Sequence, residues 1–256
     1  MLKKAEPIVP QFHLPLRLAM FVSGGGTTAQ AIVRACKRGG ELFGLVKPVL
    51  AIASKHGINA IPRMKTEGME PENIVVIRSM DFENQDAFGR ALLAECAMQR
   101  VDVIGQYGWL KKTPANVIAK YPCAMINQHP GPLDPGFPDF GGQGMYGLRV
   151  HEARILFAQQ TGRDFWTEAT AQFVTEEFDR GALVNTCVVE INPDDTPELL
   201  AERVLAHEHA IQIAALRDFA TREVIDIPRK DRLIRRGEEE LLAQVKTQAI
   251  RMYPHG

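Results

Sequence analysis

The sequence predicts an α/β protein whose core is an open, mostly parallel β-sheet with helices on both faces. Two observations lead to this fold class. Short apolar runs of strand length alternate with longer segments whose apolar residues recur at the helical spacing i, i+3, i+4 and i+7. The alternation begins early, because the apolar run 18–22 is followed by a helical pattern that starts at Ala29. Strand, turn and helix in this order are typical of parallel sheets.

The remaining elements continue this alternation along the chain. A helix is expected at 84–98, where Phe88, Leu92 and Cys96 share one face. Further strands are expected at 48–53, 73–77, 101–105 and 124–127, followed by a late pair at 169–174 and 182–191. Later helices are expected at 149–159, 196–221 and 238–252. Thr196 can cap the long helix, and Pro197 suits its first turn.

The domain organisation follows from length and composition. A chain of 256 residues with 45% hydrophobic residues can bury a sizeable core. No repeat or low-complexity linker divides it. We therefore expect a single domain over 1–225 with a soft division near residue 120, and a charged C-terminal tail over 226–256 that contains a helix.

The charge balance favours a small-molecule partner. The chain has 30 Lys and Arg against 31 Asp and Glu, so it carries no overall electrostatic footprint for nucleic acid or anionic lipid. The balance of charges does not exclude a basic patch on one face of the protein. The sequence also leaves a homodimer open.

The cysteines and the N-terminal residues indicate the cell compartment. No pair of the four cysteines has the short spacing of a zinc site or a redox dithiol, so we expect buried, reduced thiols and no metal. Residues 1–11 lack the apolar core of a signal peptide, and no stretch is long enough to span a bilayer. These features predict a cytoplasmic protein.

A glycine-rich loop at 23–28, Ser-Gly-Gly-Gly-Thr-Thr, separates the first strand from the first helix. Glycines allow close approach of backbone to a ligand, and a helix N-terminus attracts anions, so the loop is a phosphate-binding candidate. It also matches a loose dinucleotide pattern. However, the second strand ends in Ser54-Lys55, where a nicotinamide site would need an acidic residue. The alternative is a tight turn with no ligand.

A polar strand end at 127–130, Asn-Gln-His-Pro, is the most informative segment. Residues two apart face the same side of a strand, so Asn127 and His129 should project together where the strand ends. A carboxamide and an imidazole can stabilise an oxyanion, and the imidazole can also transfer a proton. The alternative is a polar strand end satisfied by a turn.

Three motifs in this order make the sequence resemble the phosphoribosylglycinamide formyltransferase family of 10-formyltetrahydrofolate-dependent enzymes. They are the loop Ser-Gly-x-Gly, the strand end Asn-x-His-Pro, and the segment 173–181, Phe-Val-Thr-Glu-Glu-Phe-Asp-Arg-Gly. The resemblance extends over about 18–224. It implies the Rossmann-like formyltransferase fold, with an N-terminal phosphate-binding half and a catalytic half.

The resemblance also implies roles for individual residues. The catalytic trio would be Asn127, His129 and Asp179. The substrate phosphate would bind Gly25, Gly26, Thr27 and Thr28, the ribose would bind Glu208, and the folate would lie against Gly108, Trp109, Leu110, Val174 and Thr175. The formyl donor would be 10-formyltetrahydrofolate, and the acceptor would be the amine of glycinamide ribonucleotide in purine biosynthesis.

The residues alone support part of these assignments. Helical spacing from Val204 and Ile211 places Glu208 beside an inward apolar stripe, although a buried structural salt bridge would explain this equally. Asp179 precedes Gly181 in a turn, where a capping carboxylate is the alternative.

The sequence departs from the family pattern after His129. The segment 131–147 is lengthened and rich in glycine, and Gln172 stands where the glycinamide ribonucleotide enzymes commonly have histidine. We expect the segment to shape the acceptor side of the site, with a surface excursion as the alternative. Other acceptors therefore stay open: an amino sugar nucleotide, methionyl-tRNA, or water in a hydrolase. A non-catalytic phosphate- or nucleotide-binding module is the contrasting reading.

Overall fold

The structure is a computed structural model that describes residues 9–229 and 231–256. Its strands form one sheet in the order β3-β2-β1-β4-β5-β6-β7. The strands are β1 (Leu16–Val22), β2 (Val46–Ala53), β3 (Ile74–Val76), β4 (Val103–Gln106), β5 (Met125–His129), β6 (Trp166–Phe173) and β7 (Leu183–Glu190). Neighbouring strands from β3 to β5 pair in parallel, whereas β6 and β7 form an antiparallel pair. The expected open, mostly parallel α/β sheet is confirmed.

The helices agree with the sequence pattern where the pattern is long. They are α1 (Thr27–Ala35), α2 (Ala60–Thr66), α3 (Gln85–Met98), α4 (Ala115–Lys120), α5 (Leu148–Thr161), α6 (Pro197–Thr221) and α7 (Glu239–Met252). Asn84 caps α3 by accepting a hydrogen bond from the Ala87 amide at 2.9 Å. The sequence missed α2 and α4, which are too short to show a helical period. Among the described residues, no helix is both long and apolar enough to cross a bilayer.

The chain divides into two compact units. One contains the described residues up to Gln128 together with Gln212–Ile225, and the other contains His129–Ile211 and Asp226–Gly256. The expected single domain over 1–225 and its soft division near residue 120 stay predictions.

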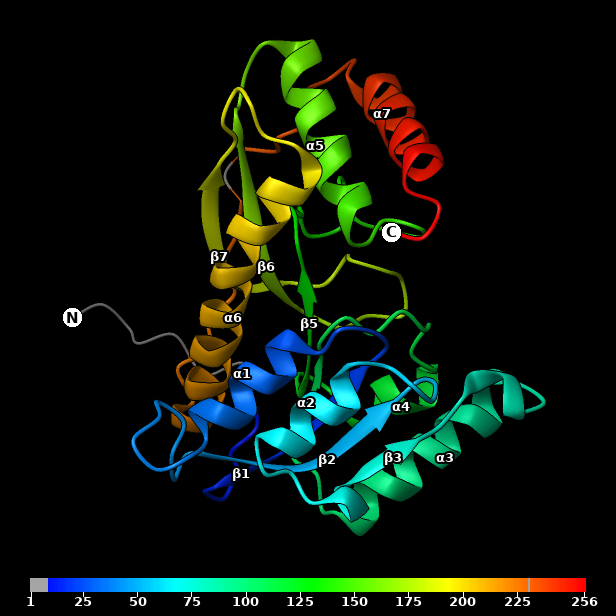
Figure 1. Ribbon diagram of the computed structural model, residues 1–256, viewed down its shortest axis with the longest axis vertical. Coiled ribbons are helices and arrows are strands. Elements are labelled where there is room, and N and C mark those ends of the chain that lie inside the picture. Colours follow the sequence, from blue (N-terminus) through cyan, green and yellow to red (C-terminus); the bar gives the residue numbers. More distant parts are fainter. Residues whose placement is uncertain (1–8, 230) are drawn as a thin grey trace. The chain divides into compact units, whose positions relative to one another are not determined.

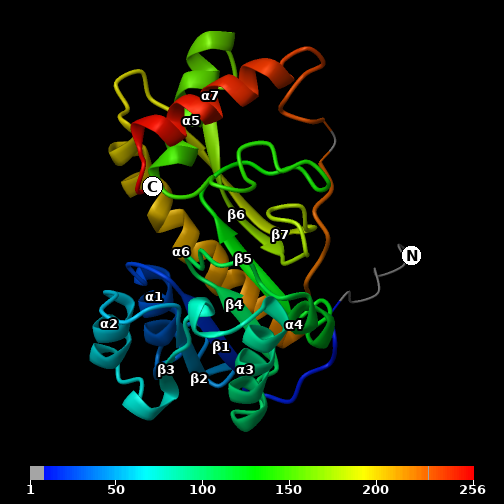
Figure 2. The same cartoon turned by 90° about the vertical axis from the view of Figure 1, so that its right-hand side faces the viewer.

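The first unit is a parallel sheet covered by helices on both faces. The residues of β1 from Leu18 to Val22 are fully buried. Figure 2 shows α1 and α2 on one side of β1, β2 and β3, and α3 and α4 on the other. Because β1 and β4 are parallel neighbours, the segments that follow them emerge at the same edge of the sheet. This edge carries the glycine-rich loop and the segment that begins at Tyr107.

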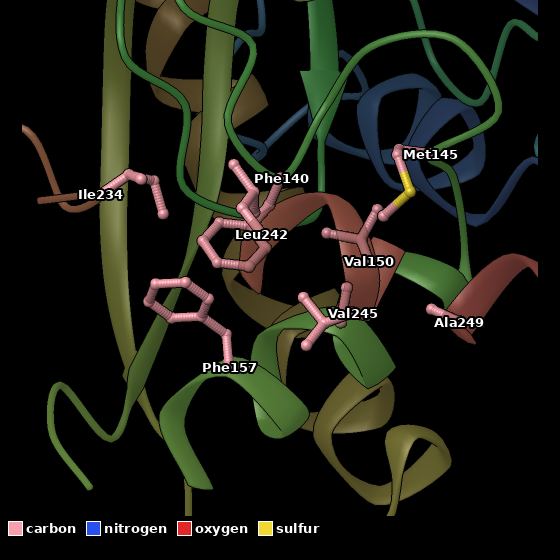
Figure 3. Close-up of a cluster of buried hydrophobic side chains, with 9 residues drawn as sticks. Phe140, Met145, Val150, Phe157, Ile234, Leu242, Val245 and Ala249 are labelled. Carbon is pink, nitrogen blue, oxygen red and sulfur yellow. The ribbon is translucent and has the colours of Figure 1, made fainter. Parts of the chain in front are cut away.

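The second unit contains the β6–β7 pair and a helical layer in which α7 packs against α5 (Figure 1). Figure 3 shows the apolar cluster that joins these helices to the loop before α5. We call it the tail cluster, and its buried members are Phe140, Met145, Val150, Ala153, Phe157, Ile234, Leu242, Val245 and Ala249. The expected tail helix is therefore present and contributes to a core.

The four cysteines are free thiols, as the sequence predicts. The expectation that they are buried holds fully for Cys96 alone, since Cys36 and Cys187 are partly buried and Cys123 is exposed. Cys123 lies in the turn before β5 and has a left-handed φ of 51°. Turns of this kind lie at the surface because their backbone groups need solvent.

Candidate active site

The glycine-rich loop connects β1 to α1 and leaves the start of that helix open. Gly26 occupies the N-cap position with φ 73°, and as a glycine it provides no side-chain cap for the helix. A Cβ at Gly26 would lie 2.3 Å from the Cβ of Ala60, so only glycine fits beside α2. Gly25 is exposed, and a Cβ there would meet nothing within 4 Å. The uncapped amides, with no acidic residue in the first turn, suit an anion.

Ser23 ties this loop to the segment after β4. Its amide donates to the Gly108 carbonyl at 3.1 Å, and its hydroxyl accepts from the Leu110 amide at 3.0 Å. Ser54 donates to the same hydroxyl at 2.9 Å. The structure therefore brings the expected phosphate loop and the expected folate segment together at one edge of the sheet.

The side chain of Trp109 is buried and leaves only the backbone of this residue for contact with a ligand. The indole is 6% exposed and lies 5.1 Å from the Phe21 ring and 6.4 Å from the Phe88 ring, centroid to centroid. It is thus a core side chain. Leu110 is 49% exposed, so it is the side chain of this segment that a ligand can contact.

Strand β5 carries Asn127 and His129. Strand alternation places both side chains on one face, as the sequence predicts. Asn127 is partly buried and pairs in register with Gln106 of β4. His129 is 3% exposed, and its Nε2 has no hydrogen-bond partner within the described ranges. A buried ring nitrogen without an internal partner is a natural contact for a substrate.

Asp179 lies in the turn between β6 and β7, next to His129. Its Oδ2 is 3.8 Å from His129 Nδ1. Its φ of 58° is left-handed, a conformation that Asp tolerates better than most residues. Two residues later, a Cβ at Gly181 would lie 1.8 Å from the Phe173 carbonyl oxygen, so the turn requires glycine there.

Uncharged groups donate hydrogen bonds to the Asp179 carboxylate. The Gln172 side chain donates to Oδ1 at 2.7 Å, and the Gly142 amide donates to Oδ2 at 2.8 Å. Gln172 is thus a contact of the predicted trio, although the sequence singled it out only as a departure from the family. The contact with Gly142 has no signal in the sequence, because it joins two loops far apart in the chain.

Burial controls the protonation of the histidines. Desolvation lowers the pKa of His129, and the Lys246 charge lowers it as well, while Asp179 and a hydrogen bond to the Phe140 main chain raise it. Burial also lowers the pKa of His151, to about 4, with a smaller effect from His129. At neutral pH both rings are therefore uncharged, and His129 can accept a proton.

Glu208, Val174 and Thr175 complete the set of predicted site residues. Glu208 is buried on α6 between the buried Val204 and Ile211, as helical spacing predicts. Val174 and Thr175 begin the loop after β6, where the Thr175 hydroxyl donates to the Glu177 carbonyl at 2.8 Å. Their proposed roles with ribose and folate stay predictions.

The long segment 131–147 is not a surface excursion. Leu133, Phe140 and Met145 are buried, whereas Phe137 is exposed. A Cβ at Gly141 would lie 2.7 Å from the Asp179 carboxylate, so this glycine allows the loop to approach the site. The segment therefore packs against the residues expected to do chemistry.

Comparison with known proteins identifies related sequences and structures. The family model described as formyl transferase matches residues 16–216. The chloroplastic phosphoribosylglycinamide formyltransferase of Arabidopsis thaliana is 32% identical, over 78% of this chain and 65% of its own length. The corresponding protein of Vigna unguiculata is 30% identical, over 82% of this chain and 62% of its own length. The chain thus spans just under two thirds of these relatives.

Solved structures agree. The crystal structure of phosphoribosylglycinamide formyltransferase from Brucella melitensis superposes with a TM-score of 0.67 at 29% identity, covering 83% of this chain and 99% of that one. The glycinamide ribonucleotide transformylase 1 structure from Geobacillus kaustophilus gives a TM-score of 0.66 at 28% identity, covering 80% and 98%.

A first prediction separates the two roles of the glycine-rich loop. Gly26→Ala should lower the free energy of unfolding by roughly 2 kcal/mol or more, because it adds left-handed strain and a collision with α2. Gly25→Ala should change it by less than about 0.5 kcal/mol, since the site is open. Urea denaturation monitored by circular dichroism measures both. Equal effects would show that the loop's conformation differs from the one described.

A second prediction concerns pH. Below about pH 6.5 an unfolded histidine binds a proton that buried His151 excludes down to about pH 4, so folding stability falls as the pH drops. His151→Gln removes this dependence. The unfolding free energy of the wild type, measured relative to that of the variant, should therefore fall by roughly 2 kcal/mol when the pH is lowered from 7 to 4.5. A constant difference would mean that His151 is not buried in its neutral form.

Proposed function

Because the chain belongs to the formyl transferase family, we propose that it transfers a formyl group from 10-formyltetrahydrofolate to the amine of glycinamide ribonucleotide. The observation that carries this proposal is the buried His129, whose Nδ1 faces Asp179 and whose Nε2 has no partner among the described residues. The names of the relatives support glycinamide ribonucleotide as the acceptor. The uncapped start of α1 supports a phosphate on that acceptor.

The proposed reaction is a direct transfer. The amine nitrogen of the acceptor attacks the formyl carbon, and the C–N bond that forms pushes an electron pair onto the formyl oxygen. The Asn127 carboxamide would donate a hydrogen bond to this oxyanion. The bond from the formyl carbon to the folate nitrogen then breaks, and that nitrogen takes up a proton.

His129 is suited to carry the proton between the two nitrogens. Its lowered pKa keeps the ring uncharged at neutral pH, so Nε2 can accept the proton that the attacking amine must lose. The imidazolium formed in this way is stabilised by the nearby Asp179 carboxylate. The same proton can then pass to the leaving folate nitrogen. Holding both reactants together would supply much of the remaining acceleration.

The two substrates would use the other predicted residues. Gly25, Gly26, Thr27 and Thr28 would hold the phosphate, and Glu208 would accept hydrogen bonds from the ribose. The folate would lie against two backbone segments, Gly108 to Leu110 and Val174 to Thr175. The Ser23 contacts support this arrangement because they fix the first of these segments. A cytosolic location and a homodimer stay predictions from the sequence.

A third prediction tests the trio together with the function. Asn127→Ala and Asp179→Asn should each lower kcat by on the order of a hundredfold, because both residues act mainly in the transition state. The assay follows consumption of 10-formyltetrahydrofolate with glycinamide ribonucleotide. Asp194→Asn is the control, since Asp194 is an exposed carboxylate outside the proposed site.

The choice of acceptor is tested in the same assay with wild-type protein. Faster turnover with an amino sugar nucleotide or methionyl-tRNA would replace glycinamide ribonucleotide as the acceptor. Donor consumption with no amine added would indicate a hydrolase. If no donor is consumed under any condition, the proposed activity is refuted and the non-catalytic phosphate- or nucleotide-binding module is favoured.

A fourth prediction addresses the phosphate. Gly25→Ala places a methyl group where a phosphate would approach the open amides, so the KM for the phosphorylated acceptor should rise about tenfold or more. The KM for the folate should stay within about twofold. An acceptor that lacks the phosphate provides the matched control, since its KM should be the same for both proteins. Equal increases in both KM values would contradict a phosphate site at Gly25.

A further inference from the structure

The tail beyond the family match reaches the loop that holds Asp179. The match to the family model ends at residue 216, whereas α7 spans Glu239–Met252. This helix packs against α5 and against Phe140 and Met145 through the tail cluster (Figure 3). Arg149 of α5 fixes the residues after α7, since it donates to the Tyr253 and Pro254 carbonyls at 2.7 and 2.6 Å. The position of α7 is therefore defined at both its apolar face and its end.

Lys246 is the charged residue that α7 directs at this loop. Its ammonium donates to the Asp139 carbonyl at 2.8 Å and to the Gly141 carbonyl at 2.7 Å. A Cβ at Gly142 would lie 4.0 Å from the same nitrogen. The next backbone group along the chain, the Gly142 amide, donates to Asp179 Oδ2 at 2.8 Å. A chain of direct contacts thus runs from α7 through one turn to the Asp179 carboxylate.

A second tail cation supports the same turn. Arg232 donates to Oδ1 of the buried Asp139 at 2.6 and 3.0 Å. Its guanidinium also lies 4.1 Å from the centroid of the Phe137 ring. Asp139 has a left-handed φ of 38°, a conformation that costs most non-glycine residues free energy although Asp tolerates it better than most. Both cations contact this residue, Lys246 at its carbonyl and Arg232 at its carboxylate.

The charge of Lys246 also acts on the site. Burial lowers the pKa of Lys246, while the Asp139 and Asp179 carboxylates raise it. Lys246 in turn lowers the pKa of His129, which Asp179 raises. Asp179, Lys246 and the neutral His151 are thus titratable groups that interact with His129 in the described part of the chain.

We propose that Lys246 is a positioning residue for the reaction, which holds the turn 139–142 so that the Gly142 amide fixes the Asp179 carboxylate beside His129. The kinetic consequences of this proposal rest on the proposed formyl transfer, whereas the contacts of Lys246 come from the structure. Lys246 touches no substrate in this proposal. It acts through the turn, and its charge also contributes to lowering the pKa of His129.

The kinetic test compares two cations of the same helix. Lys246→Met should lower kcat about tenfold or more while the KM for the folate stays within about threefold, because Lys246 contacts the segment expected on the acceptor side and not the segments expected to bind the folate. Arg251→Met is the matched control, since Arg251 is exposed on the same helix, and its kcat should stay within about twofold. The acid limb of the kcat profile should move to higher pH in Lys246→Met only, because removal of a positive charge favours the imidazolium. Unchanged kcat and pH profile would overturn the proposal.

A measurement without turnover separates this proposal from the proposed function. In NMR hydrogen exchange, the Gly142 amide should exchange at least tenfold faster in Lys246→Met than in wild type, while the Val245 amide changes much less. Equal acceleration of both amides would show a general loss of stability and would overturn a positioning role. If Lys246→Met folds poorly, Lys246→Gln is used instead, because it keeps a donor for the carbonyls without the charge. The kinetic comparison and the exchange comparison are then made with Lys246→Gln and are judged in the same way. If the wild-type protein transfers no formyl group, the proposed function fails and the exchange test still applies.

Discussion

The protonation chemistry proposed for this protein depends on how the Asp179 carboxylate is held. A carboxylate that is largely buried is unstable unless its oxygens accept hydrogen bonds. Here each oxygen accepts one from an uncharged group, the Gln172 carboxamide and the Gly142 amide. Uncharged donors stabilise the carboxylate without cancelling its charge. The field of Asp179 therefore still acts on His129, whose Nδ1 is 3.8 Å away.

Gln172 gives the site a simpler titration than a histidine would. A carboxamide donates the same hydrogen bond at every pH, so the hydrogen bond from Gln172 to Asp179 is not lost as the solution becomes alkaline. The histidines that titrate nearby, His129 and His151, are both kept uncharged by burial. In the proposed reaction His129 becomes charged only when it accepts a proton, which is the step at which the Asp179 carboxylate stabilises it most.

Local patterns in the sequence predicted most of the fold and part of the site. Strand and helix periods located β1 to β7 and the longer helices, because burial of one face leaves a repeat in the sequence. Strand alternation also placed Asn127 and His129 on one side of β5. Pairing of His129 with Asp179 followed only from the family resemblance, since the two residues come from different strand ends. The burial of Trp109 was missed because a large aromatic residue in a loop fits a ligand and a core equally well.

Contacts of the C-terminal tail could not be read from the sequence. An amphipathic helix shows which of its faces is apolar, but not which partner covers that face. Lys246 follows Val245 on α7 and would pass for a solvated surface lysine in any pattern. Its partners are two backbone carbonyl oxygens, and because every residue has a carbonyl group, the sequence does not identify them. Similarly, the need for glycine at position 26 arises from Ala60 on a helix that was not predicted.

The tail explains how a lengthened loop can lie against a buried site. Loops usually stay at the surface because their backbone polar groups need partners that water supplies. In the segment 131–147, side chains replace water: Lys246 satisfies the carbonyls of Asp139 and Gly141, and Arg149 satisfies that of Gly144 at 2.8 Å. The apolar residues of the segment then pack into the tail cluster, with Phe140 completely buried. Without α7, the partner of the Asp139 and Gly141 carbonyls would be lost, together with Leu242, Val245 and Ala249 of the cluster. The loop and the tail therefore depend on each other for their structure.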